Sequence, residues 1–398
     1  MKILFLLHGL GISGGTYVVF QHARFLKSQG HEVIFFSNLP EDKKQSRWHP
    51  FLEEISLLSW DECKSRTWDS VVATFWLTAF QAPALKAKSY VYFVQSIESR
   101  FYFGEENKFV RELVDATYSM AFTYVTEATW IKEYLLENHS QTCALVRNGI
   151  DKELYHSPNN EDLPSPRKQL RVLIEGPLGI DFKQVIPTIR LLNEFHDIET
   201  WLLTSTKIGW VPKVDKLFSS VPVTQVPAIM RQCDLILKLS LIEGMFGPPL
   251  EMFHCGGTAI TYDISGHAEY MVHQKNSLVA KVGDKNEVRQ HIRRLNSDRP
   301  YLSELRSNAL ATARAWPDWS ESSCQFEAFL SHTPLTGNLD VPSTETTRLE
   351  SAFDYFGINS AKTLKSRVKL FGLRPLSARE FYRDLKFWAA ILKPETAR

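Results

Sequence analysis

The chain has 398 residues, of which 44% are hydrophobic and 12% aromatic. Because single hydrophobic cores stop growing at about 250 to 300 residues, this length predicts two domains. Lysine plus arginine number 46 and aspartate plus glutamate 45, so the formal charge is +1. Because this nearly neutral charge gives no electrostatic reason to bind nucleic acid, we exclude nucleic acid as a partner.

The cysteines and the first residues indicate a cellular compartment. Residues 3–7 form a short apolar run with no small-residue cleavage site after it, so we expect a first strand rather than a signal peptide. No stretch approaches roughly 18 uninterrupted apolar residues, and no membrane-spanning helix is expected. The five cysteines lack C-x-x-C spacing, which favours buried, reduced thiols in a cytoplasmic protein over a disulfide framework or a zinc site.

Residues 1–155 are expected to form a Rossmann-like domain. Apolar runs alternate with helical patterns such as residues 16–29, and this alternation is typical of parallel βαβ units. The strands expected in this domain are residues 3–7, 33–36, 71–75, 91–94 and 122–125.

The first loop, residues 9–14, has the spacing G-x-G-x-x-G between a strand and a helix. A dinucleotide fold also needs an acidic residue at the end of the second strand to bind the ribose hydroxyls, but that strand ends here in Ser37 and Asn38. We therefore exclude an NAD or FAD site. Gly14 and Gly15 are interpreted as part of a loop where a phosphate or an acceptor approaches the backbone.

A second Rossmann-like domain is expected over residues 168–333. It follows residues 156–168, whose proline, asparagine and acidic side chains are a linker composition. Its expected strands are residues 171–176, 201–205, 235–242 and 258–262.

Residues 243–251, EGMFGPPLE, carry the strongest functional signal. They follow an apolar run and precede a helix that starts at two prolines and stops at two glycines, so they form a strand, turn and helix corner. Ligands of open α/β sheets bind at the carboxyl ends of strands, and a helix N-terminus attracts phosphate there. Since Glu243 and Glu251 are placed to accept hydrogen bonds from sugar hydroxyls, the corner predicts a nucleotide-sugar site.

The spacing Glu, seven residues, Glu, followed by C-G-G, resembles the donor-site signature of retaining glycosyltransferases of family 4, which have the two-domain GT-B fold. Residues 233–270 are most similar to WsaF-like bacterial polysaccharide rhamnosyltransferases. Residues 92–102 resemble the N-domain cleft segment of that family, and residues 146–151 its crossing between domains. The resemblance covers roughly residues 1–330 and implies a last helix that crosses back to the first domain.

The resemblance also implies roles for individual residues. Glu243 is expected to contact the transferred sugar, Glu251 the nucleotide ribose, and Lys183 the diphosphate. In the first domain Glu98 follows an expected strand, where it either orients or deprotonates the acceptor hydroxyl or is a solvated side chain. Further expected donor-site residues are Gly14, Gly15, Gly244, Phe246, Gly247 and His267.

The charge of a leaving diphosphate must be neutralised as the glycosidic bond breaks. No two aspartates are separated by a single residue, so the D-x-D pair that holds a divalent ion in the other large transferase fold is missing, and we expect neither a metal nor another cofactor. The family often has an arginine near the position of Pro177 or Leu178, which this chain lacks. Lys207 and Lys238 are the two candidates to replace it.

Residues 334–398 are expected to form a basic helical extension. Residues 361–398 hold 10 basic and 3 acidic residues, a net charge of +7, interleaved with aromatic side chains. Such a segment fits an amphipathic element on an anionic membrane surface, and it equally fits helices packed on the enzyme or on a partner glycosyltransferase.

The function expected from these features is that of a retaining, metal-independent glycosyltransferase. It would move a hexose or deoxyhexose, with rhamnose as one candidate, from a dTDP-, UDP- or GDP-linked donor to a lipid-linked or polysaccharide acceptor of a bacterial cell-surface glycan. The alternatives are a sugar-nucleotide epimerase on the same scaffold and a non-catalytic partner in glycan assembly. The expected location is the cytoplasm, with peripheral attachment to the inner face of the plasma membrane.

Overall fold

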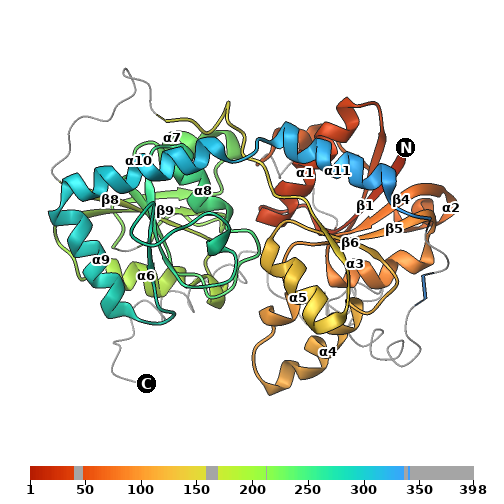
Figure 1. The fold of residues 1–398 in the computed structure, drawn as a ribbon, viewed down its shortest axis with the longest axis horizontal. Coiled ribbons are helices and arrows are strands. Elements are labelled where there is room, and N and C mark those ends of the chain that lie inside the picture. Colours follow the sequence, from red (N-terminus) through yellow and green to blue (C-terminus); the bar gives the residue numbers. More distant parts are fainter. Residues whose placement is uncertain (40–47, 158–168, 212, 336–338, 341–398) are drawn as a thin grey trace.

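The structure, a computed structural model, describes residues 1–39, 48–157, 169–211, 213–335 and 339–340. These residues form two α/β domains that lie side by side (Figure 1). Most of the extension expected over residues 334–398 lies outside the described part of the chain, and so does the whole basic segment 361–398.

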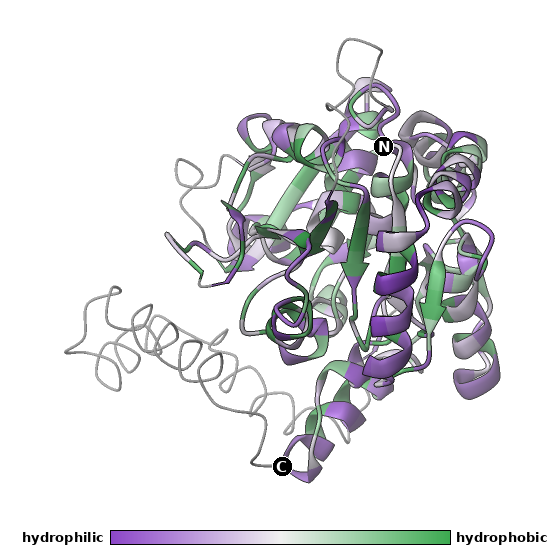
Figure 2. Cartoon of the chain, turned by 90° about the vertical axis from the view of Figure 1, so that its left-hand side faces the viewer, coloured by the Kyte–Doolittle hydropathy of each residue, from purple (hydrophilic) through white to green (hydrophobic). Residues whose placement is uncertain are grey.

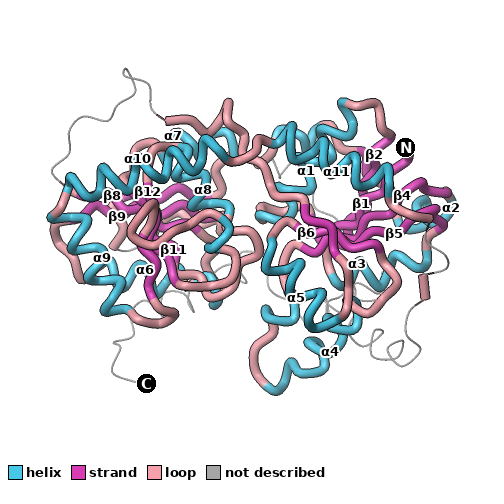
Figure 3. The backbone as a smooth tube through the Cα atoms, viewed as in Figure 1, coloured by secondary structure: helices cyan, strands magenta, loops and turns pink. Residues whose placement is uncertain are grey.

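The N-terminal domain is a parallel sheet with helices on both faces (Figure 3). Its strands are rich in apolar residues because both faces are covered. In the first strand, Leu4 and Leu6 belong to one hydrophobic cluster and Ile3 and Phe5 to another, as the two-residue period of a strand requires. Its main elements are β1 (Lys2–Gly9), α1 (Gly14–Ser28), β2 (Glu32–Leu39), β3 (Ser56–Leu57), α2 (Trp60–Ser65), β4 (Thr67–Ala73), α3 (Trp76–Gln81), β5 (Lys86–Val94), α4 (Lys108–Thr117), β6 (Thr123–Thr126), α5 (Thr129–His139) and β7 (Cys143–Leu145).

The C-terminal domain repeats this architecture on a second parallel sheet. The strand expected over residues 235–242 is shorter than predicted, because its ladder with the neighbouring strand ends where Lys238 pairs with Thr261. The elements are β8 (Leu170–Glu175), α6 (Val185–Leu192), β9 (Ile198–Thr204), β10 (Lys216–Ser219), α7 (Val226–Met230), β11 (Leu235–Lys238), α8 (Gly247–His254), β12 (Thr258–Tyr262), β13 (Leu278–Ala280), α9 (Lys285–Ser297), α10 (Arg299–Ala315) and α11 (Trp319–His332).

Both sheets have a point at which the strand order reverses. Over the described residues the orders are β3-β2-β1-β4-β5-β6-β7 and β10-β9-β8-β11-β12-β13, so β1 and β4 are neighbours in one sheet and β8 and β11 in the other. Ligands of open α/β sheets bind outside the carboxyl ends of strands at such a point. The loops at these ends meet between the domains, where the rings of Phe101 and Phe182 stack with 5.2 Å between their centroids.

Two crossings between the domains involve residues that the structure describes, and they lie side by side. Helix α10 packs on α8, whereas α11 packs on α1, so the chain returns to the N-terminal domain between α10 and α11 (Figure 1). At the second crossing Ile150 N donates to Pro317 O at 3.1 Å, and Trp316 Nε1 donates to Asn148 O at 2.7 Å. These paired segments are where a hinge between the domains would bend.

The helices carry many hydrophilic residues, whereas the strands in view are mostly hydrophobic (Figure 2). Among the described residues, no helix combines the length and the apolar character needed to span a membrane. All five cysteines are free thiols; four are buried, as expected, but Cys324 on α11 is exposed.

Candidate active site in the cleft

Four charged side chains form a network at the carboxyl edge of the second sheet. Glu243 lies in the loop after β11, and its Oε2 is 2.7 Å from Lys183 Nζ, while its Oε1 is 3.7 Å from Lys238 Nζ. Lys238 also pairs closely with Glu175. Glu175 and Lys238 end the adjacent strands β8 and β11, and Lys183 ends the 3₁₀ turn Asp181–Lys183 after β8. The network therefore occupies the point of strand reversal.

The pairing within the network favours the charged forms of Glu243 and Lys238. Burial alone would raise the pKa of Glu243, but the charges of Lys183 and Lys238 hold that pKa below its usual value. Burial likewise acts to lower the pKa of Lys238, but Glu175 and Glu243 outweigh burial and raise this pKa. Among the described residues, Glu243 Oε1 has no hydrogen-bond partner although it is buried. A hydroxyl of a bound ligand would relieve the cost of that unsatisfied oxygen.

Glu251 lies on α8, one turn into the helix, and belongs to a different environment. Burial raises its pKa to about 8, the charge of Glu175 acts in the same direction, and a hydrogen bond from Tyr155 opposes them. The carboxyl therefore holds its proton near neutral pH in the absence of a ligand. The pKa of the buried Tyr270 phenol is raised by burial and then by the charges of both Glu243 and Glu251, so this ring lies within electrostatic reach of both carboxyls.

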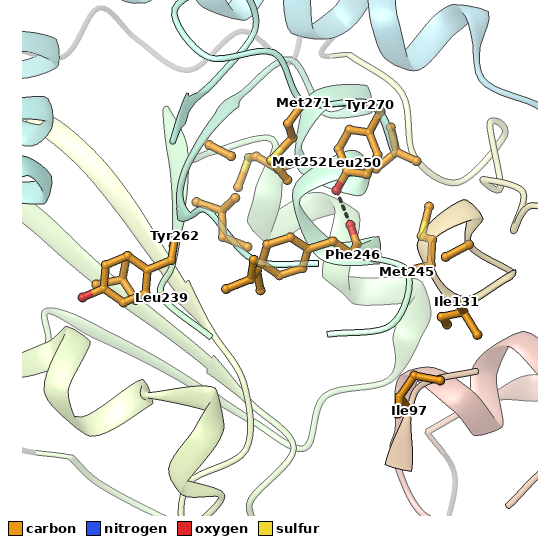
Figure 4. Close-up of a cluster of buried hydrophobic side chains, with 14 of the residues drawn as sticks. Ile97, Ile131, Leu239, Met245, Phe246, Leu250, Met252, Tyr262, Tyr270 and Met271 are labelled. Atoms are coloured by element: carbon orange, nitrogen blue, oxygen red, sulfur yellow. Dashed lines mark hydrogen bonds between the residues drawn. The ribbon is translucent and has the colours of Figure 1, made fainter. Parts of the chain in front are cut away.

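The start of α8 offers fewer free N–H groups than expected. Gly247 N already donates to Met245 O at 3.0 Å, and the next two residues are prolines, which have no N–H. Phe246 buries its ring completely, and its carbonyl accepts a hydrogen bond from Tyr270 (Figure 4). In this conformation the backbone N–H of Gly247 is therefore not free to bind a diphosphate, and the placement of Gly247 at the donor site stays a prediction.

The other residues expected at the donor site are spread around the cleft. Gln95 Nε2 donates to Gly15 O at 3.1 Å, which connects the loop after β5 to the start of α1, where Gly14 is the first residue. His267 Nδ1 lies 2.6 Å from Ile264 O in the loop after β12. Of the two candidate phosphate-binding lysines, Lys238 is buried in the network, and Lys207 is exposed in the loop after β9.

Glu98 is not a solvated side chain. It is 5% exposed, and its Oε2 accepts hydrogen bonds from Trp76 N at 2.8 Å and Tyr92 Oη at 3.2 Å. Burial raises the pKa of Glu98 to about 8, although these two hydrogen bonds lower it. A carboxyl that keeps its proton near neutral pH is a poor base there. We therefore interpret Glu98 as a group that holds the 95–98 segment in place, and its catalytic role stays a prediction without direct support.

Sequence reasoning overlooked Glu127, Trp130 and Glu175. Glu127 directly follows β6 and Glu175 ends β8, so the rule that singled out Glu98, a polar residue at the carboxyl end of a parallel strand, applies to both. Trp130 lies in the first turn of α5 and gives no comparable signal. Within the described part of the chain, no group of three or more His, Cys, Asp or Glu side chains is arranged to hold a metal ion.

Comparison with known proteins supports a glycosyltransferase. The family model of glycosyl transferases group 1 matches residues 214–314, which include β11, α8 and β12. An uncharacterized glycosyltransferase from Methanocaldococcus jannaschii is 21% identical over 188 residues, 45% of this chain and 51% of the relative. The match thus spans about half the length of that relative.

Solved structures with the same architecture identify the fold. HepE from Anabaena, in complex with UDP and glucose, has a TM-score of 0.69 and 17% identity, and the alignment covers 83% of this chain and 99% of HepE. WaaG, a glycosyltransferase involved in lipopolysaccharide biosynthesis, has a TM-score of 0.65 and 14% identity over 83% of this chain and 100% of WaaG. Sucrose-phosphate synthase from Thermosynechococcus elongatus has a TM-score of 0.66 and 12% identity, and the alignment covers 83% of this chain and 98% of the synthase. The chain has the GT-B fold, as the sequence predicted.

Proposed function

We propose that the chain is a glycosyltransferase that takes a sugar from a nucleoside diphosphate donor. The observation that carries the proposal is the ion-pair network of Lys183, Glu243, Lys238 and Glu175 at the strand reversal of a GT-B C-domain. It combines the partly exposed ammonium of Lys183, suited to a diphosphate, with Glu243 Oε1, which has no hydrogen-bond partner among the described residues and is suited to a sugar hydroxyl. The match of residues 214–314 to the group 1 family supports the same reading.

The reaction we propose retains the configuration of the transferred sugar. The acceptor oxygen bonds to the anomeric carbon on the face from which the diphosphate oxygen departs, and the acceptor proton passes to the departing phosphate. Lys183 Nζ stabilises the charge that grows on the diphosphate, and Glu243 holds a hydroxyl of the sugar. Because protein cations supply this stabilisation, activity should survive EDTA; loss of activity in EDTA that Mg²⁺ or Mn²⁺ restores would overturn the metal-independent form of the proposal.

The proposed donor is a UDP-, dTDP- or GDP-linked hexose or deoxyhexose. UDP and glucose are bound in the HepE structure, which supports a nucleoside diphosphate sugar here by similarity of fold. Rhamnose is proposed from the resemblance of residues 233–270 alone. The proposed acceptor is a lipid-linked or polysaccharide chain of a bacterial surface glycan, reached from the cytoplasmic face of the membrane. No observation favours an epimerase or a non-catalytic partner over this function.

The donor class can be tested by thermal unfolding with a panel of UDP-, dTDP- and GDP-linked sugars. A ligand that binds only the folded state, present at 100 times its dissociation constant, adds about 2.7 kcal/mol to the free energy of unfolding. We expect one nucleotide series to stabilise the protein and its best member to be consumed, with release of the nucleoside diphosphate. Stabilisation without release on any acceptor would favour a binding partner, and no stabilisation by any member would contradict the proposal.

A further inference from the structure

The peptide bond next to Glu243 is held on both sides by the other domain. Trp130 Nε1 donates to Gly244 O at 3.0 Å, and Met245 N donates to Glu127 Oε1 at 3.1 Å. Glu127 directly follows β6, and Trp130 lies in the first turn of α5, so both belong to the β6–α5 corner of the N-terminal domain. Both polar atoms of the Gly244–Met245 peptide therefore bind N-domain side chains.

Apolar packing accompanies these hydrogen bonds. Met245 faces Ile97 and Ile131 of the N-terminal domain (Figure 4), and all three side chains are buried in one hydrophobic cluster. Gly244 lies against the carbonyl oxygen of Gln95 so closely that a Cβ atom at position 244 would overlap it. Contact this close needs glycine at position 244.

A second loop of the C-terminal domain docks on the same segment. The N-cap residue of helix α5, Ala128, forms no side-chain hydrogen bond that caps the helix. Instead, Thr129 N donates to Glu269 Oε1 at 2.6 Å and Thr129 Oγ1 donates to Glu269 Oε2 at 3.0 Å, so a carboxylate of the other domain caps the helix. Arg147 Nε lies 3.5 Å from Glu269 Oε2. Glu269 follows His267 by two residues, so this contact also fixes the loop after β12.

Glu127 is itself fixed in place. It is 5% exposed, and its Oε2 accepts a hydrogen bond from Asn148 Nδ2 at 2.9 Å, in the first interdomain crossing. Burial raises the pKa of Glu127 to about 7; hydrogen bonds from Asn148 and Met245 lower it, and the charge of Glu243 raises it. A neutral amide can therefore take the place of this carboxyl.

From these contacts we infer that residues 127–130 are a docking element that fixes the loop carrying Glu243 when the domains close, with Glu127 and Trp130 as positioning residues for the reaction. The role in the reaction rests on the proposed function, whereas the docking itself does not. Neither residue needs to touch a substrate: each acts on Glu243 through the backbone of the neighbouring peptide.

Three variants separate positioning from folding. Glu127→Ala removes the acceptor of Met245 N, whereas Glu127→Gln keeps one. Among the described residues Asn148 Oδ1 has no hydrogen-bond partner, so a flipped Asn148 amide can accept from the new Gln. Trp130→Phe keeps the aromatic ring but removes the donor to Gly244 O. Glu133→Ala, at an exposed position of the same helix, is the matched control.

The test that needs no substrate is amide hydrogen exchange of residues 243–247 in the full chain. We expect Glu127→Ala and Trp130→Phe to raise the exchange rate by about 10-fold or more, and Glu127→Gln and Glu133→Ala by less than about 3-fold. Equal protection in wild type and Glu127→Ala would overturn the docking element. Because this readout does not depend on a donor, a protected segment in a protein that turns over no nucleotide sugar would refute the proposed function alone.

The positioning role is tested by kinetics with the best donor of the panel. Glu127→Ala should lower kcat by about 10- to 100-fold and leave the Kd for the nucleoside diphosphate within about 3-fold, and Glu127→Gln should restore most of kcat. An unchanged kcat in Glu127→Ala, or a loss of kcat matched by a loss of global stability and not rescued by Gln, would overturn the positioning role.

Discussion

Lys183 and Glu243 are 60 residues apart in the chain, yet their side chains form an ion pair with 2.7 Å between Nζ and Oε2. They come from the loops after β8 and β11, the two neighbouring strands at which the sheet order reverses. The lysine side chain is 21% exposed and the glutamate 8%. The lysine side chain is thus the more exposed partner, where an anionic ligand can reach it, and the glutamate side chain is more deeply buried.

Lys183→Ala should lower donor turnover by roughly 100-fold, the usual cost of losing one group that stabilises charge in the transition state. The substitution also leaves Glu243 with Lys238 as its cation, at the longer distance of 3.7 Å. The control is Lys88→Ala. Lys88 is exposed, forms an ion pair with Asp69, and lies near the amino end of β5, whereas the candidate site is at the carboxyl ends of the strands. Release of nucleoside diphosphate from the best donor measures both, and full turnover in Lys183→Ala would remove its proposed role.

Gly244→Ala should prevent the domains from closing, because the added methyl overlaps the carbonyl oxygen of Gln95. We expect small-angle scattering to give a larger radius of gyration than for wild type, and turnover to fall. Gly209→Ala is the control, since a Cβ atom there meets nothing within 4 Å. Identical scattering of wild type and Gly244→Ala at saturating nucleotide would mean that the closed arrangement is not the one populated in solution.

Glu98→Gln should flatten the pH dependence of stability. The pKa of Glu98 is raised to about 8 by burial, against about 4.3 in an unfolded chain, so the native state holds a proton that the unfolded state releases. The contribution of Glu98 to the free energy of unfolding is fully present below pH ~4.3 and is lost as the pH rises through about 8. Between pH 6 and 8 the free energy of unfolding of Glu98→Gln should fall by about 1–2 kcal/mol less than that of wild type. Urea unfolding at both pH values measures this, and equal losses would show that Glu98 is ionised when folded.

The basic segment 361–398 predicts attachment to anionic membranes. Each basic residue near such a surface contributes about 1 kcal/mol, so a net charge of +7 should give strong binding at low salt that is lost at high salt. The comparison is between the full chain and a chain that ends at Asp340, which keeps the buried Leu339. We expect the full chain to float with phosphatidylglycerol vesicles and the shortened chain not to. If both chains float equally, or if neither floats, the membrane interpretation is wrong and docking on a partner protein is the remaining interpretation.

The corner at residues 243–251 could be predicted because its signals are local. An apolar run, a glycine turn and a helix start at two prolines predicted Glu243 at a strand end and Glu251 one turn into a helix. Glu251 lies one turn into α8 as predicted, whereas β11 ends at Lys238 and Glu243 lies in the loop after it. The alternation of strands and helices predicted two domains of parallel βαβ units, and the resemblance to family 4 glycosyltransferases implied the GT-B fold. The pairing of Glu243 with Lys183 was not predicted, although both residues were singled out.

The contacts between the domains could not be predicted from local patterns. Met245 N and its acceptor Glu127 are 118 residues apart, and their meeting depends on how the two domains sit on each other. Glu98 shows a different limit: it follows a strand end, as cleft residues do, but the 3₁₀ turn Glu98–Phe101 directs its carboxyl to Trp76 N and Tyr92 in the domain interior. The sequence shows that a residue follows a strand at the edge of a sheet, but it does not show in which direction the side chain of that residue points.

The central claim is that Glu243 acts on the transferred sugar and Glu251 on the nucleotide. Since burial raises the pKa of Glu251 to about 8, its carboxyl is protonated near neutral pH and Gln would mimic it, so Ala is the informative change there. Glu251→Ala should weaken binding of the nucleoside diphosphate by about 10-fold, with a smaller effect on kcat.

The most direct test is donor hydrolysis by Glu243→Gln, measured as release of nucleoside diphosphate beside a titration of nucleotide binding. Our account predicts that kcat falls by about 100-fold or more while the Kd for the nucleoside diphosphate stays within about 3-fold of wild type, because the carboxylate contributes in the transition state rather than to nucleotide binding. Full turnover in Glu243→Gln, or a loss explained entirely by weaker nucleotide binding, would contradict it.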